Sequence, residues 1–132
     1  MKITVARRNA QVDNFTGQCN SGLLRLYNGT KPTDADTALS GNTLLAELTL
    51  NATAFGASSS GTATANAITQ DSSADATGTC SFARMFASNG TTALADLTVG
   101  VGSGELQLNT LSIVSGLPVQ VTALTVSQPL GS

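Results

Sequence analysis

Apolar and polar residues alternate with a period of two along most of the chain after residue 17. Within Thr43–Leu50, four alternate positions that share one face are all apolar: Leu44, Ala46, Leu48 and Leu50. Because successive side chains of a β-strand point to opposite faces, this alternation predicts a half-buried strand. Strand-like runs also occupy Leu23–Asn28, Gly61–Gln70, Cys80–Ala87, Thr92–Gly100, Glu105–Val114 and Leu117–Ser127.

Turn-forming residues separate these runs. The sequence SNG at Ser88–Gly90 stands between two alternating segments, which is a hairpin signal. The glycine-rich stretch Gly100–Glu105 predicts a second hairpin loop. About seven to eight short strands with regularly spaced turns predict an all-β fold, a single antiparallel β-sandwich or barrel.

The first 17 residues break this pattern and predict a short helix or an arm. Thr4 is placed to cap such a helix, Val5, Val12 and Phe15 would share one face, and Gly17 would end it. The expected organisation is therefore an arm or short helix over residues 1–17, followed by a β-sandwich domain over residues 18–132.

The stretch Asn51–Gly78 consists almost entirely of Ala, Ser, Thr, Gly and Asn. Its central part, Gly61–Gln70, alternates Thr62 and Thr64 with Ala63 and Ala65, which predicts a strand with one face of small residues. The flanking segments read as loops. A flexible linker of the same composition is the alternative.

Charged residues make up only 11% of the 132-residue chain, and the net charge is −2. They are unevenly placed: residues 1–31 hold five basic residues and one acidic residue, giving +4, whereas residues 32–132 hold one and seven, giving −6. A basic end and an acidic body can pair between copies, or the basic end can dock on an acidic partner; ordinary scatter is the alternative. A pI near 4.7 argues against nucleic acid as a partner.

The sequence offers no residues for the common catalytic or metal-binding arrangements. It contains no His, which removes the commonest general base and metal ligand. The strongest calcium candidates are Asp34 with Asp36 and Asp71 with Asp75, but neither pair has the spacing of a known calcium loop. Asp in such Ser/Thr-rich turns commonly bonds its own backbone. We therefore expect no enzyme activity, no catalytic residue, no cofactor, no metal and no small-molecule substrate.

The two cysteines, Cys19 and Cys80, are expected to be reduced thiols. The N-terminal residues contain no apolar segment of the secretory type, which predicts synthesis in the cytoplasm, where disulfides are rare. Cys80 stands in a strand-like run and is expected to be a small buried side chain. No apolar run is long enough for a membrane-spanning helix, so no membrane partner is expected.

Three motifs resemble those of a family of small tailed-phage proteins. These are an R-x-Y-x-G-x-x-P opening at Arg25–Pro32, an S-G-x-x-L-L-A strand at Ser40–Ala46 and a D-x-S-A-D-A-T-G turn at Asp71–Gly78. The resemblance extends over Leu23–Pro129. This chain departs from it at Phe82, where a heavier aromatic cluster is expected, which would alter core packing rather than the role.

The resemblance implies a bacteriophage virion structural protein, with capsid decoration, or cementing, as the expected role. Its implied partner is the major capsid protein, on the exterior of the virion capsid, and a homo-oligomer is expected. The alternatives are another virion component, such as a tail or head-fibre protein, or a fimbrial or adhesin-type binding module. From the charge pattern we expect the capsid or inter-subunit contact to involve five residues of the N-terminal segment: Lys2, Arg7, Arg8, Val12 and Phe15.

Overall fold

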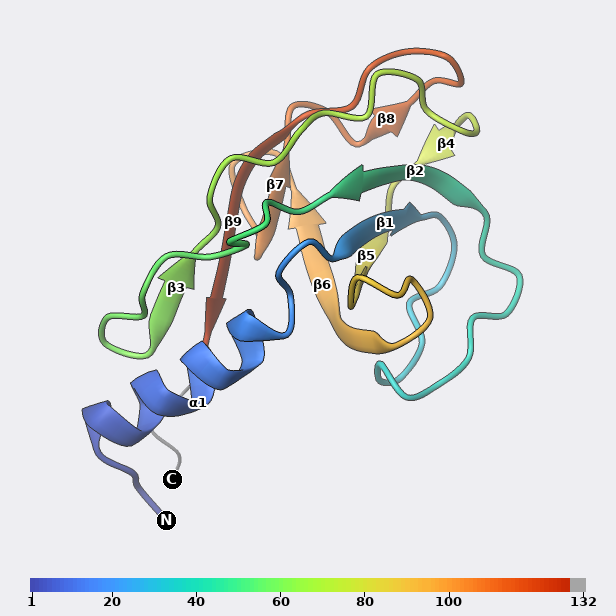
Figure 1. Cartoon of the computed structure of the whole chain (residues 1–132). Helices are drawn as coiled ribbons and strands as arrows, with labels where there is room; N and C mark the ends of the chain where they lie inside the picture. Colours follow the sequence, from blue (N-terminus) through green and yellow to red (C-terminus); the bar gives the residue numbers. More distant parts are fainter. Residues whose placement is uncertain (129–132) are drawn as a thin grey trace.

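The alternating segments form one seven-stranded sheet in the computed structural model, which describes residues 1–128 (Figure 1). Its strands are β1 (Leu23–Tyr27), β2 (Leu44–Thr49), β3 (Thr62–Thr64), β5 (Phe82–Phe86), β6 (Ala93–Gly100), β7 (Leu106–Leu108) and β9 (Val121–Ser127). Their spatial order is β2-β1-β5-β6-β7-β9-β3. Two short strands, β4 (Gly78–Thr79) and β8 (Ser112–Ile113), pair in a second sheet. Residues 1–128 are thus mostly β with one short helix. The expected β-domain was drawn to residue 132, and its last four residues lie outside the described ones.

The all-β part of the expected antiparallel sandwich or barrel is confirmed, but two details of it are wrong. Strands β6 and β7 pair in parallel, with Val99 opposite Leu106. The sheet also does not close into a barrel. The segment 65–76 lies between β2 and the residues that precede β9. Asp75 N donates to Leu45 O on β2, and Asp71 exchanges backbone hydrogen bonds with Val119, which precedes β9. Because this segment is rich in Ala, Ser and Asp, which are depleted in strands, it makes isolated bridges rather than a ladder.

The glycine-rich loop between β6 and β7 is not a hairpin, contrary to expectation. Parallel neighbours normally need a crossover of about a dozen residues, but here residues 101–105 suffice. The loop is tight enough that a Cβ on Gly100 would lie 2.5 Å from Ser103 O. Gly102 and Gly104 have φ of +76° and +86°, which L side chains rarely adopt. The three glycines therefore allow the loop to double back within five residues.

The predicted hairpin between β5 and β6 is confirmed. Gly90 has a φ of +73° and donates its N–H to Ala87 O at 2.9 Å. The Asn89 side-chain oxygen accepts the backbone N–H groups of Thr91 and Thr92, both at 3.0 Å. These bonds fix the turn, so β5 and β6 pair antiparallel, with Ala83 opposite Leu97.

The strand predicted over Gly61–Gln70 is much shorter than expected. Only Thr62–Thr64 form β3, which pairs with β9. Ala63 is buried, as expected for the face of small residues, whereas Ala67 is exposed. Beyond Thr64 the chain leaves the ladder to become the bridging segment 65–76. The Ala- and Ser-rich stretch is accordingly folded, with backbone hydrogen bonds to distant strands.

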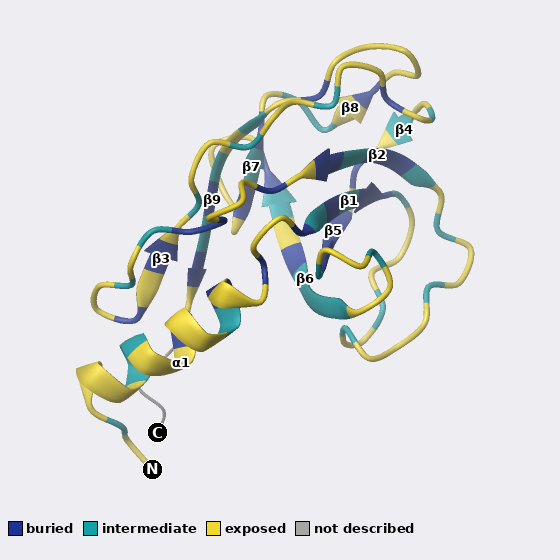
Figure 2. Cartoon of the chain, in the orientation of Figure 1, coloured by how far each residue is buried: buried dark blue, intermediate teal, exposed yellow. Residues whose placement is uncertain are grey.

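The sheet is buried on both faces at its centre (Figure 2). One face carries the main apolar core, which includes Leu24, Leu48 and Met85. The opposite face carries Tyr27 and Phe82, whose rings stack with centroids 5.5 Å apart. Every residue of β5 is buried.

The N-terminal helix α1 (Val5–Gly17) forms as predicted, and Thr4 caps it. The Thr4 hydroxyl accepts the backbone N–H of Arg7 at 3.2 Å. The helix lies at one end of the molecule, beside β3 (Figure 1). Val5 does not share the buried face with Val12, because the first turn extends past the sheet and leaves Val5 49% exposed. No helix among residues 1–128 is long and apolar enough to cross a membrane.

Candidate functional site

Polar contacts attach helix α1 to the loop before β3 and to the end of β9. The Asn9 side-chain oxygen accepts the Gly61 N–H at 2.8 Å, and Asp13 accepts the Ser58 N–H at 3.0 Å. Arg8 Nε donates to the Gln128 carbonyl at 2.7 Å. The Arg8 guanidinium lies so close to Gly61 that a Cβ there would be 2.6 Å from Arg8 Nε. Arg8 therefore belongs to the attachment of the helix, while Arg7 one residue earlier is exposed.

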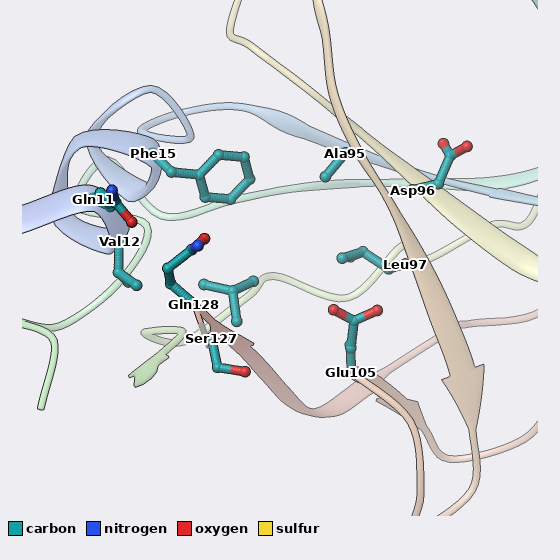
Figure 3. Close-up of a pocket in the computed structure, with 10 residues that line it drawn as sticks. Gln11, Val12, Phe15, Ala95, Asp96, Leu97, Glu105, Ser127 and Gln128 are labelled. Carbon is teal, nitrogen blue, oxygen red and sulfur yellow. The ribbon is translucent and has the colours of Figure 1, made fainter. Parts of the chain in front are cut away.

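A depression of about 240 Å³ lies between helix α1 and strands β6 and β9, and we call it the helix groove. Figure 3 shows the Phe15 ring extending from the helix toward Ala95, with Leu97 pointing into the same space. The Asp96 carboxylate points away from this space. The groove thus has an apolar floor. Polar groups at its margin come from Gln11, Glu105, Ser127 and Gln128.

A second, more open depression of about 490 Å³ lies on the outer side of the same helix. It is lined by Arg7, Ala10, Gln11, Asn14, Phe15 and Gln18. Gln11 and Phe15 line both depressions. The two depressions therefore adjoin at Gln11 and Phe15. Arg7 lines only the outer depression and Glu105 only the helix groove, so the two charges belong to different sides of this shared boundary.

The five residues expected to make contacts do not form one cluster. Val12 and Phe15 come together in the helix groove, but Val12 is only 4% exposed and packs into the fold. Arg8 is tied to Gln128. Lys2 and Arg7 are exposed.

Sequence reasoning missed the residues that complete the groove from the other side, chiefly Leu97, Glu105 and Val126. They come from three segments far from the helix in sequence. The one available signal was Glu105, an isolated charge directly after the glycine-rich loop.

Four charged residues form a row across four neighbouring strands on the face opposite the main core. In register, Glu47 pairs with Arg25, Arg25 with Arg84, and Arg84 with Asp96. The Arg25–Glu47 ion pair is partly exposed, and the Arg25 guanidinium also lies 4.5 Å from the centre of the Phe86 ring. Because each arginine has its own carboxylate at the outer end of the row, the two adjacent cations are neutralised.

The three motifs that carry the phage-protein resemblance meet at one end of the sheet. Asn28, from the first motif, accepts the Thr43 N–H through its side chain at 2.7 Å, and Asn42 donates back to Asn28 O. The third motif joins the second through the backbone bond from Asp75 to Leu45 O, and Gly78 lies against the Leu45 side chain. These motifs therefore describe one packed structural unit.

The carboxylates of Asp34 and Asp71, in the acidic turns, accept hydrogen bonds from within the fold. Asp34 accepts the Asp36 N–H and the Thr37 hydroxyl, and Asp71 accepts the Ser73 and Glu47 N–H groups. These contacts confirm that both aspartates bond nearby backbone. Among residues 1–128 no group of three His, Cys, Asp or Glu side chains is placed to hold a metal ion.

Cys19 and Cys80 are free thiols, and both are buried. Burial raises the pKa of each to about 11, so both thiols are protonated at neutral pH. Because the thiolate is the reactive form of cysteine, neither is suited to act as a nucleophile.

No family model matches the chain, and no curated protein or solved structure matches it significantly.

Proposed function

We propose that this chain is a bacteriophage virion structural protein that binds the major capsid lattice from outside and stabilises the head. The observation that carries the proposal is the convergence of the three resembling motifs into one packed unit. The first two motifs meet because consecutive strands commonly pair, but the third is distant in sequence and still packs on Leu45 of the second. A shared unit of this kind supports membership of the same family of sandwich-like β-domains, and with it the structural role.

The chemistry of the chain is consistent with a mechanical role. Its buried charges are paired, its thiols are buried, and its surface is rich in Ala, Ser and Thr. A surface with few charges loses little solvation when it packs against another protein. Many copies bound to one lattice multiply modest contacts by multivalency. Binding only to the assembled lattice shifts the equilibrium against its disassembly.

The end of the molecule that carries helix α1 is the proposed contact region. Lys2 is exposed there, and the helix is held to the body by the polar contacts described above and by the packing of Val12. An acidic shell surface would attract this end, and the attraction would weaken with added salt.

The proposal is tested by mixing the purified protein with undecorated capsids and measuring occupancy after sedimentation. We expect the parent protein to co-sediment and to raise the temperature at which the shells fall apart. Lys2→Glu should reduce occupancy, more strongly at low salt, whereas Lys31→Glu is a matched control because Lys31 is exposed on a loop far from the helix. If Lys2→Glu binds as the parent does, the contact must instead lie elsewhere, first in the loops 56–61 and 70–78.

A second measurement separates this role from the other virion roles. Labelled antibody against the chain, applied to purified particles, should decorate the head uniformly. Label on the tail or on isolated fibres would assign the chain to another virion component. Absence from particles whose protein content is otherwise complete would remove the virion role altogether.

A further inference from the structure

We propose that the helix groove and the outer depression beside it bind a second copy of this chain, with Arg7 of each copy paired to Glu105 of the other. This inference deepens the homo-oligomer expected from the sequence, and it rests on the proposed function for its biological setting. Its physical basis is the charge and shape of this one surface, and it can be tested on the isolated protein.

The two charges at the ends of this surface lack ionic partners among the described residues. The Arg7 guanidinium is exposed and makes no hydrogen bond or ion pair within residues 1–128, although its backbone N–H bonds the Thr4 cap. From residues 1–128, the Glu105 carboxylate accepts hydrogen bonds only from Thr98, through the backbone N–H at 3.2 Å and the hydroxyl at 3.4 Å. In contrast, the side chains of Arg8, Arg25 and Arg84 all have partners.

This arrangement is self-complementary. A twofold axis places the same patch of both copies in contact, so that residue i meets residue j and residue j meets residue i. A surface with a cation at one end and a carboxylate at the other satisfies both charges when a second copy is laid on it in the reverse direction. The uneven charge of the sequence, basic at the N-terminal end and acidic in the body, follows the same polarity.

The apolar part of the surface lies where the axis would pass. Phe15 lines both depressions and so stands near the middle of the surface, above Leu97 and Val126. Its ring is half-buried in the single chain. A second copy would cover the remaining exposed area, and the two Phe15 rings would approach each other at the axis. Central aromatic side chains surrounded by polar groups are typical of the residues that carry binding energy in interfaces.

The experiment is sedimentation equilibrium of the full chain over a range of concentrations, at low and at high salt. We expect the parent to form dimers that dissociate more readily at high salt. Arg7→Gln and Glu105→Gln should each raise the dissociation constant about tenfold or more, as expected for loss of two equivalent charge pairs. Glu105→Gln retains an oxygen that can accept the Thr98 hydrogen bonds, so the loop before β7 should keep its fold.

Exchanging the charges of Arg7 and Glu105 is the decisive experiment. Arg7→Glu and Glu105→Arg should each abolish the dimer, and the double variant should restore it because the pair is rebuilt with reversed signs. Lys31→Glu and Asp36→Arg make the same charge changes on the exposed loop between β1 and β2 and should leave the dimer intact. Melting curves of every variant confirm that each protein is folded.

Two results would overturn the inference. The first is a parent protein that stays monomeric up to about 1 mM. The second is a dimer whose dissociation constant is changed neither by Glu105→Gln nor by the charge exchange. Capsid binding is measured separately. A Glu105→Gln monomer that still binds shells supports the inference and leaves the decoration role standing. A parent dimer that obeys the charge exchange yet ignores shells supports the inference and contradicts the decoration role.

Discussion

Arg84 and Asp96 form a two-point ion pair between neighbouring strands β5 and β6. Nε lies 2.6 Å from Oδ1, and Nη2 lies 3.0 Å from Oδ2. The two side chains are only 5% and 6% exposed, and Arg84 also donates to the Asp34 carbonyl in the loop that covers this face. The hydrogen bonds to Asp96 raise the pKa of Arg84, so the buried guanidinium remains charged. The pair therefore joins the sheet to the loop between β1 and β2.

Removing the carboxylate of this pair should destabilise the protein strongly. Asp96→Asn leaves a buried cation without a counter-charge, which costs about 3–5 kcal/mol of unfolding free energy. Glu47→Gln is the matched control, because it removes the carboxylate of the partly exposed Arg25 pair and should cost less than about 1 kcal/mol. Urea unfolding of both variants gives the comparison. Equal losses would mean that burial does not set the importance of these pairs.

Alkaline pH should destabilise the protein through its two thiols. Burial raises the pKa of Cys19 and Cys80 from the ordinary 9.0 to about 11, so the unfolded state ionises first. The contribution of the two thiols to the free energy of unfolding is complete below pH 9. It is lost as the pH rises toward 11, by about 1.4 kcal/mol per pH unit for each thiol. Urea midpoints between pH 8 and about 10.5 should fall accordingly. The fall should be shallower in Cys19→Ala and shallower still when Cys80→Ala is added; an unchanged slope would contradict the assignment.

The glycines of the loop between β6 and β7 should differ in their tolerance of a side chain. Gly102→Ala meets no neighbour within 4 Å and is strained only by its φ of +76°, so it should cost about 1–2 kcal/mol. Gly100→Ala would place a Cβ 2.5 Å from the Ser103 carbonyl oxygen, which requires the backbone to move. We expect the larger loss at Gly100, measured by urea unfolding. A larger loss at Gly102 would show that the loop is not closed as described.

The N-terminal cap should affect the helix more than the sheet. Thr4→Ala removes the hydroxyl that accepts the Arg7 N–H and should destabilise the helix by about 1 kcal/mol, whereas Thr4→Ser keeps the acceptor. Hydrogen exchange should therefore accelerate at the helix amides of Thr4→Ala by about fivefold and remain unchanged in β5. Equal acceleration in β5 would instead indicate that helix and sheet unfold as one unit.

Local sequence signals predicted the elements that local chemistry decides. Thr4 and Gly17 marked the helix bounds, and Ser88–Gly90 marked the hairpin, because a cap or a tight turn depends on a few adjacent residues. The burial of Cys80 also followed from its position in an alternating run.

Long-range pairing could not be predicted in the same way. Nothing within the Gly100–Glu105 sequence distinguishes a hairpin loop from one that returns β7 in parallel, since both need glycine. The strand expected over Gly61–Gln70 ended at Thr64 because the chain there turns to bond β2 on one side and residues 117–124 on the other. The helix groove likewise depends on bringing Phe15 against Leu97 and Val126, which no local pattern encodes.

The position of β9 has a consequence for how the chain folds as it is synthesised. β9 is the last described strand in sequence, yet it lies inside the sheet between β7 and β3, and Leu124 O also accepts the Ala65 N–H. Until Val121–Ser127 have left the ribosome, β3 and β7 therefore lack their shared neighbour and the nascent sheet remains divided. Unpaired strand edges in a partly made chain invite pairing with other chains. Completion of the sheet thus waits for β9, and a chain that stops before Val121 would leave β3 and β7 without their shared neighbour and prone to aggregation.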